Sequence, residues 1–352
     1  MRQFGLILEN VDGLEQPSVM RGVPHNLGMP MSMKSDLDGI EEATGWSGDG
    51  SPAGTLRGFT IGAIVQHLPK TLNRGEGVDF RMPTDLELDA MEAFMLSVGR
   101  QQDVDLEEMA FSDPAAERGR KLFLGEGINR DCHACHANAG ATSTFSGFNA
   151  NFDTGTRHIS LAEPPDGGLG RAAQSGIAGF GDGTMNTPSL IEAADAAPFF
   201  HNNSAATLED AIAFYGSNEF ARSPGGADFG GRFEFAEGNI EDIGALLRTL
   251  NALENIRYSN VVSDQAQRTV PPAAAMARIA EVVADTEDAF EVLAERDICP
   301  PAVDLISEAL DLEQKARTTI QKKRRNALLS DAASLKEQAS ELMLGADQDC
   351  AP

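Results

Sequence analysis

Apolar residues recur at helical spacing in several stretches of the chain, and local capping signals mark where helices begin. The segment TDLELDAMEAFMLSVGR starts with Thr84 and carries Glu87 three residues later, which is the spacing of a capping box. The segment SDPAAERGRKLFLGE has helical spacing too, and either Ser112 or Asp113 can cap it. These signals predict two separate helices.

Two further helices are predicted within residues 110–258. TLEDAIAFY reads as a helix capped by Thr207. The stretch NIEDIGALLRTLNALENI places apolar side chains on one helix face, at Ile240, Ile243, Leu246, Leu247 and Leu250. Long glycine-rich loops lie between the predicted helices, which is unusual in a compact domain unless the loops wrap another object.

The last part of the chain, residues 259–352, shifts to Ala, Glu, Leu, Lys and Gln, which favour helices. Pro300 and Pro301 interrupt this pattern directly after Cys299, so two or three helices are predicted. The helical stretches are residues 270–297, 300–330 and 331–345. We expect this extension to contact the rest of the chain or a partner, and we interpret the basic run 322–325 as a solvated helix face rather than a binding patch.

Acidic residues outnumber basic ones, 54 to 28, in this chain of 352 residues, and the formal charge is −26 at pH 7. Such a charge repels nucleic acid and anionic membranes and attracts a small basic electron donor, although acidic surfaces are also common without such a partner. No apolar run reaches the length of a membrane span, and the first residues show no export signal. We therefore expect no nucleic-acid partner and no membrane span.

The run DCHACHANAGA contains the pattern Cys-x-x-Cys-His at Cys132, Cys135 and His136. Two thiols at this spacing can add to the two vinyl groups of one porphyrin, and the next imidazole then lies beneath the iron as its proximal ligand. The competing interpretations are half a zinc site and a thioredoxin-like dithiol, but no second Cys pair, His-x-x-x-His or βαβ pattern accompanies the motif. We predict covalent haem c at this motif and interpret His133 as an exposed residue that binds no metal.

Haem iron also needs a sixth ligand or an open coordination position, and this choice separates an electron carrier from a catalyst. The candidates that follow the motif are Met185, His201 and Tyr215. Each has an ordinary structural alternative, namely a core methionine, a buried or capping histidine and a core aromatic residue. Spacing alone leaves all three open.

Four sequence features together resemble the bacterial di-haem cytochrome c peroxidase and MauG-like superfamily. They are ERGRKLF before the haem motif, CHACHANAGA itself, the stretch TPSL…APFFHNNSAATLEDAIAFY and the closing EDIGALLRTLNAL, within about residues 110–255. The resemblance implies a mainly α fold. Residues 110–258 would form a complete cytochrome c-like haem domain with long irregular loops, residues 1–109 the latter part of a first such domain without its haem motif, and residues 259–352 a C-terminal helical tail.

By this resemblance, Cys132 and Cys135 correspond to the thioether anchors, and His136 to the proximal ligand, of the second, electron-handling haem. Tyr215 corresponds to the distal ligand, where peroxidases of the family usually carry Met and the MauG-like branch carries Tyr. An anionic phenolate stabilises ferric iron, so Tyr215 implies a haem of low potential. His201 matches the histidine of the family's aromatic-His turn and is the candidate catalytic residue.

No Cys-x-x-Cys-His occurs before residue 132, so the attachment site of a first haem is absent from this sequence. His67 is a candidate distal ligand of that haem and His25 a weaker one, with a surface or core histidine as the alternative for both. A faint repeat, in which residues 187–216 echo residues 21–68, suggests two related domains. We expect one of two situations. Either the native protein starts farther upstream and carries a second Cys-x-x-Cys-His motif there, or this protein is a family member that has lost one haem.

These features predict a c-type cytochrome that transfers electrons as part of a di-haem peroxidase-like protein. The alternative is a catalytic peroxidase or MauG-like oxidase that acts on hydrogen peroxide with a second haem encoded upstream. A small redox protein or a quinone-linked donor would supply the electrons, and the resemblance also permits a calcium ion between the domains. Covalent haem attachment of this type normally takes place outside the cytoplasm, so we expect a periplasmic or otherwise extracytoplasmic location.

Two cysteines, Cys299 and Cys350, remain after the motif is assigned, and they bracket the C-terminal segment. A disulfide in an oxidising compartment and two free thiols are both open interpretations. The separation of their Cα atoms decides between them.

Overall fold

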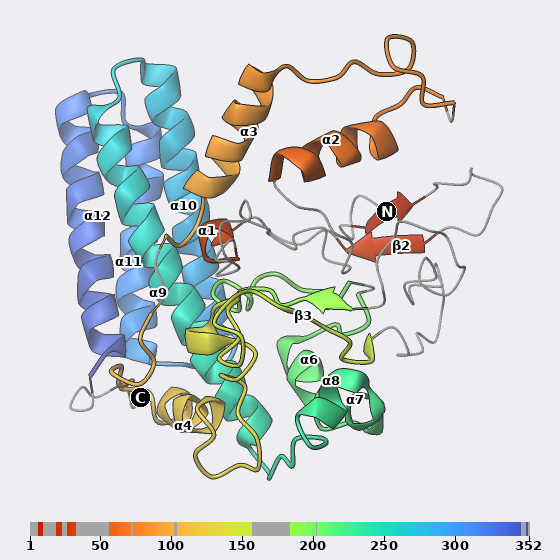
Figure 1. The fold of residues 1–352 in the computed structure, drawn as a ribbon. Coiled ribbons are helices and arrows are strands. Elements are labelled where there is room, and N and C mark those ends of the chain that lie inside the picture. The colour runs from red at the N-terminus through yellow and green to blue at the C-terminus, as the bar shows by residue number, and fades with distance from the viewer. Residues whose placement is uncertain are drawn as a thin grey trace. The chain divides into compact units, whose positions relative to one another are not determined.

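The chain is mainly helical in the computed structural model, as the apolar spacing predicts (Figure 1). The structure describes residues 6–9, 19–22, 27–32, 56–71, 73–101, 104–156, 184–201, 203–345 and 350. Its contacts group the chain into two compact units with alternating sequence ranges. The first unit comprises residues 1–104, 128–190 and 196–236, and the second comprises residues 105–127, 191–195 and 237–352.

The contact-based units have other boundaries than the three predicted domains, 1–109, 110–258 and 259–352. The boundary predicted after residue 258 falls inside one continuous helix, α9 (Asn239–Arg268). Contact grouping alone does not define domains that fold separately. The division into three domains therefore stays a prediction.

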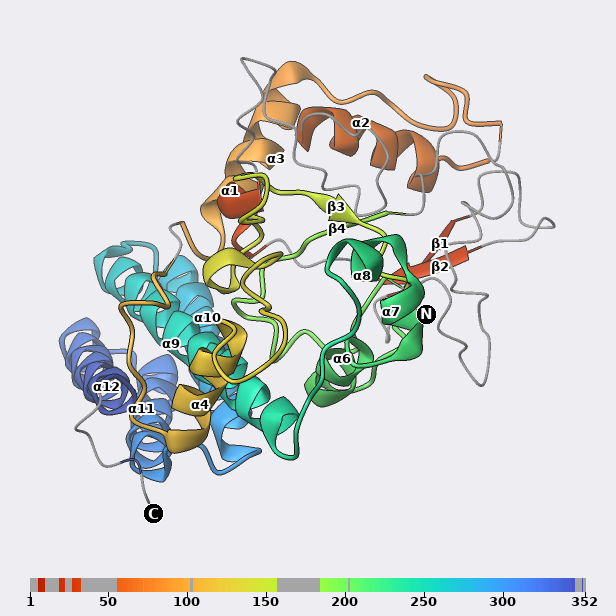
Figure 2. The ribbon, with the colours of Figure 1, turned by 60° about the horizontal axis from the view of Figure 1, so that its bottom comes forward.

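The first unit contains short helices and two small ribbons of strands (Figure 2). Its helices are α1 (Met29–Ser32), α2 (Leu56–His67), α3 (Asp85–Ser97), the 3-10 turn η2 (Ala137–Ala139), α6 (Leu208–Phe214), α7 (Asn218–Arg222) and α8 (Pro224–Asp228). The strands form two antiparallel pairs, β1 (Leu6–Glu9) with β2 (Val19–Gly22) and β3 (Asn151–Phe152) with β4 (Met185–Asn186).

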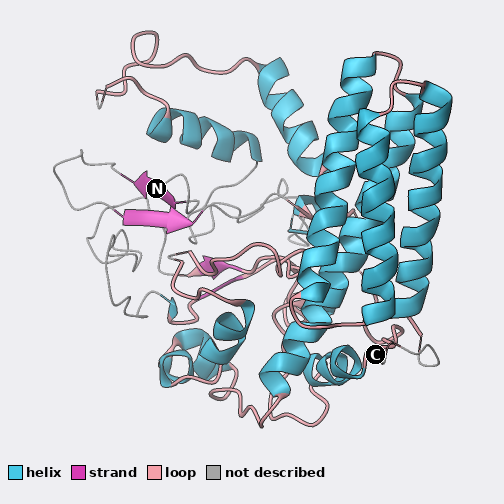
Figure 3. Ribbon diagram, turned by 180° about the vertical axis from the view of Figure 1, so that it is seen from behind, coloured by secondary structure: helices cyan, strands magenta, loops and turns pink. Residues whose placement is uncertain are grey.

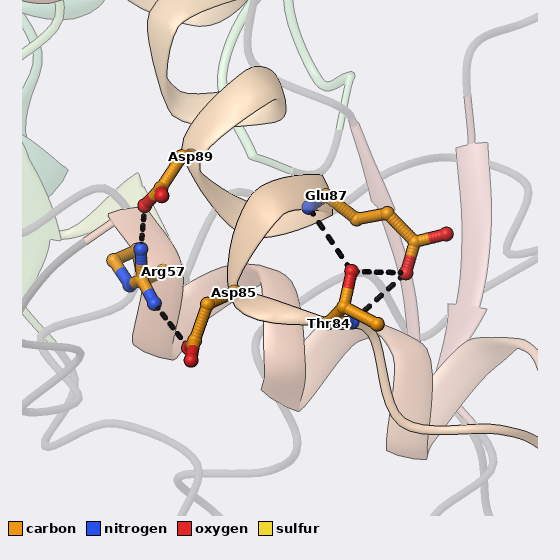
Figure 4. A network of polar contacts seen from close by, with 5 residues as sticks. All are labelled: Arg57, Thr84, Asp85, Glu87 and Asp89. Atoms are coloured by element: carbon orange, nitrogen blue, oxygen red, sulfur yellow. Dashed lines mark hydrogen bonds and ion pairs between the residues drawn. The ribbon is translucent and has the colours of Figure 1, made fainter.

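Polar contacts fix the start of α3 and join it to α2 (Figure 4). The Thr84 hydroxyl accepts a hydrogen bond from the Glu87 N–H, and the Glu87 carboxylate accepts one from the Thr84 N–H, so the predicted capping box is confirmed. Arg57 on α2 forms ion pairs with Asp85, at 2.7 Å, and with Asp89, both on α3. These pairs are largely exposed, so each adds little stability.

The second unit contains a bundle of four long helices that run side by side (Figure 3). They are α9 (Asn239–Arg268), α10 (Pro272–Ala294), α11 (Pro300–Thr318) and α12 (Lys322–Met343), and α4 (Pro114–Phe123) packs on α9. Each bundle helix contacts the next in sequence, and α12 contacts α9, which closes a ring. Short connections make consecutive helices antiparallel. Among the helices that the structure describes, none combines the length and apolarity needed to cross a membrane.

Two expectations about the tail need correction. The break between its second and third helices was expected after Ser330, but α11 ends at Thr318 and α12 begins at Lys322. The hydroxyls of Thr318 and Thr319 donate to the Lys315 carbonyl, which competes with continuation of the helix. The basic run 322–325 is not wholly solvated, because Arg325 is only 4% exposed.

The buried side chains of the bundle helices are separated alternately by four and three residues, which is the heptad spacing of coiled-coil-like packing. On α11 and α12 the buried positions are Ala302, Ile306, Ala309, Glu313, Ala316, Arg325, Leu329, Ala332, Lys336, Ala339 and Met343. A polar layer, with one residue from each helix, interrupts the apolar positions. It consists of Ser259, Thr286, Glu313 and Lys336, each 0% exposed.

Helix α4 approaches α9 closely at Gly119. A Cβ atom on Gly119 would lie 1.9 Å from the Asp242 carbonyl oxygen, so only glycine fits. Arg118 donates two hydrogen bonds, of 2.8 and 2.7 Å, to the Asp242 carboxylate. Asp113 caps α4 by accepting from the N–H groups of Ala115 and Ala116, which selects one of the two predicted caps.

Cys299 and Cys350 form a disulfide with a Cα–Cα separation of 4.4 Å, which confirms that interpretation. The bridge joins the start of α11 to the chain after α12. Just before it, Gly345 donates through its N–H to the Ala110 carbonyl and accepts from the Ser112 hydroxyl. The C-terminal segment is therefore attached to the second unit at two places.

Candidate functional site

The Cys-x-x-Cys-His motif forms a single helical turn in the first unit. The His136 N–H donates to the Cys132 carbonyl at 3.0 Å, so positions 132, 135 and 136 lie on one face of the turn. Asn138 and Ala139 then adopt the left-handed conformation, with φ of 55° and 57°, and end the turn. The half-buried His133 accepts a hydrogen bond from the Asn138 N–H at Nδ1, so it supports this turn and is not the exposed side chain that was expected.

His136 contacts a backbone carbonyl 52 residues farther along the chain. Its Nδ1 lies 3.0 Å from the Pro188 oxygen. A carbonyl can only accept, so Nδ1 carries the proton and the lone pair is on Nε2. Burial lowers the pKa of His136 to about 4, against the opposing effect of the Pro188 and Gly140 backbone contacts. The imidazole is therefore neutral at pH 7, the form that binds a metal.

Cys132 and Cys135 are free cysteines, and no disulfide joins them. Burial and, to a smaller extent, the Asp131 carboxylate raise the pKa of both side chains to about 12. Both are therefore thiols at neutral pH, whereas a thioredoxin-like dithiol needs a thiolate there. This environment disfavours the dithiol interpretation.

An aromatic cluster surrounds Cys132. Its buried members are Phe214, Phe220 and Phe233, and its half-buried members are Ile128, Cys132, Phe200, Tyr215 and Phe235. Several ring pairs meet edge to face, which is the favourable geometry for aromatic pairs. The site thus combines a histidine whose lone pair is on Nε2, two thiols and neighbouring aromatic side chains, and this donor set fits a haem c.

Tyr215 is a member of this cluster and follows directly after α6. Thr207 caps that helix with a capping box to Asp210, as the sequence predicts. Burial is the main cause that raises the pKa of the Tyr215 phenol, and Tyr215 and Cys132 pack against the same aromatic cluster. The structure therefore brings Tyr215 together with the motif. A phenolate at this position would need the charge of a bound cation.

The other two candidate ligands occupy different surroundings. His201 is half-buried in a loop closed by hydrogen bonds between Phe199 and Ala205, and the neighbouring Phe200 meets Phe214 edge to face at 5.1 Å. The loop of His201 is thus attached to the aromatic cluster. Met185 lies in β4 opposite Phe152 and is not a member of that cluster.

Neither of the two candidate ligands of a first haem has a described side chain. His67 ends α2, but its side chain is not among the described ones, and His25 lies outside the described residues altogether. In the described ranges, no group of three or more His, Cys, Asp or Glu side chains is arranged to hold a metal ion.

Sequence reasoning missed the carbonyl partner of His136 and most of the aromatic cluster. Pro188 lies in TPSL, a stretch that was singled out for resemblance and not for this contact. The phenylalanines at 220, 233 and 235 lie after Tyr215 in a glycine-rich stretch without helical or strand spacing. The signal in the sequence was the high frequency of phenylalanine in this stretch.

No family model, curated protein or solved structure matches this chain. The interpretation of the site therefore rests on its own geometry.

Proposed function

We propose that this chain is a c-type cytochrome that binds haem covalently at Cys132, Cys135 and His136 and transfers electrons as part of a di-haem peroxidase-like protein. The observation that carries the proposal is the hydrogen bond from His136 Nδ1 to the Pro188 carbonyl, beside two free thiols. It leaves Nε2 as the one ring nitrogen that can bind iron. The resemblance of residues 110–255 to the di-haem family points in the same direction.

The thiols would attach the group without an oxidant. Each S–H adds across one vinyl C=C bond, so that sulfur bonds to one carbon and hydrogen to the other. Both side chains are half-buried, in a surrounding that keeps them protonated. A haem bound here supplies one-electron transfer at its iron.

The surrounding residues would control what the bound group can do. The aromatic cluster excludes water from one side of the motif, which lowers the local dielectric constant. Tyr215 would be the second residue to hold the iron, because it is the candidate that the structure groups with Cys132. Held by His136 and Tyr215 together, the group would supply electron transfer rather than catalysis.

The test is production of the chain in a periplasm that attaches haem, followed by intact mass and a pyridine haemochrome spectrum. We expect the mass of one haem per chain and a six-coordinate spectrum that hydrogen peroxide leaves unchanged. C132A/C135A should contain no covalent haem, and N326L, changed on α12 in the second unit, should contain as much as the wild type. Wild-type protein without covalent haem would contradict the proposal.

The same preparation distinguishes the alternative, a catalytic peroxidase or MauG-like oxidase with a second haem. The loop of His201, attached to the aromatic cluster through Phe200, is the observation that favours it. A high-spin haem oxidised by peroxide, in a form that includes any upstream coding sequence, would support the alternative. Loss of that reaction in H201A, with haem content unchanged, would give His201 the catalytic role.

A further inference from the structure

The Pro188 carbonyl reaches His136 because the segment that carries it is tied on both sides. Before it, the Thr187 N–H donates to the Ala150 carbonyl at 3.1 Å. After it, the Leu190 N–H donates to the Ala139 carbonyl at 2.8 Å, only three residues beyond His136. Proline has no N–H of its own, so the Pro188 carbonyl is its one backbone hydrogen-bonding group.

One side chain, that of Asn149, completes this arrangement. Its Nδ2 donates to the Ala141 carbonyl at 2.7 Å and to the Thr187 carbonyl at 2.9 Å. It thus joins the chain just after the haem motif to the residue just before Pro188. Its Oδ1 accepts from Asn186, which also donates to Asn151 at 2.9 Å, so the amide orientation of Asn149 is fixed.

We infer that Asn149 is a positioning residue, which sets the distance from the Pro188 carbonyl to His136 and through it the electron density that the imidazole gives to bound iron. The inference rests on the proposed function. A carbonyl that accepts from Nδ1–H makes the imidazole a stronger donor, which stabilises ferric iron. When the Thr187 carbonyl loses its partner, the Pro188 carbonyl becomes free to move away from the ring.

The experiment compares the reduction potential of the wild-type holoprotein with that of N149L, which removes both donors at similar volume. We expect the ferric-to-ferrous ratio at fixed potential to fall about tenfold, a positive shift of roughly 60 mV. The control is N326L. The half-buried Asn326 on α12 donates to a backbone carbonyl, that of Gln267, and belongs to the second unit, so we expect the reduction potential of N326L to equal that of the wild type.

A second readout separates positioning from mere stability. In the ferrous holoprotein, we expect the His136 Nδ1 proton to exchange with solvent about ten times faster in N149L than in the wild type, by nitrogen-edited NMR. N149A also loses both donors and adds neither charge nor bulk, so it should shift both readouts in the same direction even if N149L fails to fold.

Several results would overturn the inference. An N149L holoprotein with lower thermal stability but unchanged potential and proton exchange would reduce Asn149 to a structural role. A wild-type Nδ1 proton that exchanges as fast as an exposed imidazole N–H would do the same without any variant. If the wild-type protein contains covalent haem and gives these results, only the inference about Asn149 is wrong. If the wild-type protein contains no covalent haem, the proposed function is wrong as well.

Discussion

The ammonium group of Lys336 has one oxygen atom for each of its three protons. Its Nζ lies 2.6 Å from Glu313 Oε1, 2.8 Å from Ser259 Oγ and 3.3 Å from Thr286 Oγ1. Both hydroxyls donate their own proton to a carbonyl in the preceding turn, so they present lone pairs to the lysine. Burial lowers the pKa of Lys336 and raises the pKa of Glu313, and the attraction between the two groups opposes both shifts. The geometry therefore pairs Lys336 with Glu313 inside the bundle.

Removing one member of this pair should cost far more than removing both. In K336M the Glu313 carboxylate is left buried without a counter-charge, and we expect the free energy of unfolding to fall by about 3–5 kcal/mol. In K336M/E313L no charge is left, and the remaining hydroxyls keep their carbonyl partners, so stability should return to the wild-type value or exceed it by about 1–4 kcal/mol. Urea unfolding of the full chain, followed by far-UV circular dichroism, measures both. A single variant as stable as the wild type would contradict the buried ion pair.

Asp285, on α10 near the polar layer, should make the stability of the second unit depend on pH. Burial, followed by repulsion from Glu281 and Asp288, raises its pKa to about 7, although Lys336 opposes the shift. The folded state therefore keeps a proton that the unfolded chain has already lost above about pH 4. The contribution of this group to the free energy of unfolding falls as pH rises from about 4 to 7.

The variant D285N removes that dependence. Relative to the wild type it should gain about 1–2 kcal/mol at pH 8 and close to nothing at pH 4, a figure reduced for the partial exposure of the carboxyl group. Unfolding curves of both proteins at the two pH values measure the difference. Equal differences at pH 4 and pH 8 would show that Asp285 titrates normally.

At the scale of elements, the contact of α4 with α9 should be intolerant of a single methyl group. In G119A the new Cβ would overlap the Asp242 carbonyl oxygen, so the helices must move apart, and we expect a loss of roughly 3 kcal/mol. The control is G62A on α2, where a Cβ meets nothing within 4 Å. There the lower backbone entropy of alanine should stabilise the helix by up to about 1 kcal/mol. Thermal unfolding of both variants checks the contrast.

The helices that the sequence predicted best begin with local signals. Thr84 and Thr207 each lie three residues before an acidic side chain, and both caps depend only on residues within one turn. The ends of helices were harder to predict than their starts. The prediction for α9 stopped near residue 256, but no proline or glycine follows until Pro271, so the helix continues to Arg268. At the end of α11, two threonine side chains compete with the helix, a weaker signal than a proline.

Contacts between distant segments could not be predicted from spacing. The motif alone predicts the haem anchors, because Cys132, Cys135 and His136 lie within five residues. Its partner Pro188 lies 52 residues after His136, and Asn149 reaches that segment through the Thr187 carbonyl, so no local signal fixes these distances. The polar layer of the bundle could not be predicted either, because its four members come from four different helices.

At the scale of the whole chain, the disulfide closes a segment with a sequence separation of 51. A bridge over that length restricts the unfolded chain and should contribute about 4 kcal/mol. We expect C299S/C350S to unfold at a correspondingly lower urea concentration. Reductant present during unfolding should lower the wild type to the same midpoint and leave the variant unchanged. Equal midpoints for oxidised wild type and variant would show that the bridge adds no stability.

The order of the bundle helices bears on how quickly the protein can fold. Helices α9 to α12 follow one another in the chain, so most of their contacts join sequence neighbours, and such low contact order gives folding in microseconds to milliseconds. The first unit instead gathers three separate stretches of the chain. We expect the bundle to reach its native helicity first, in stopped-flow refolding of chains that carry no haem. On the proposed function, Cys132 and Cys135 would then meet a porphyrin in a chain whose bundle, α9 to α12, is already folded.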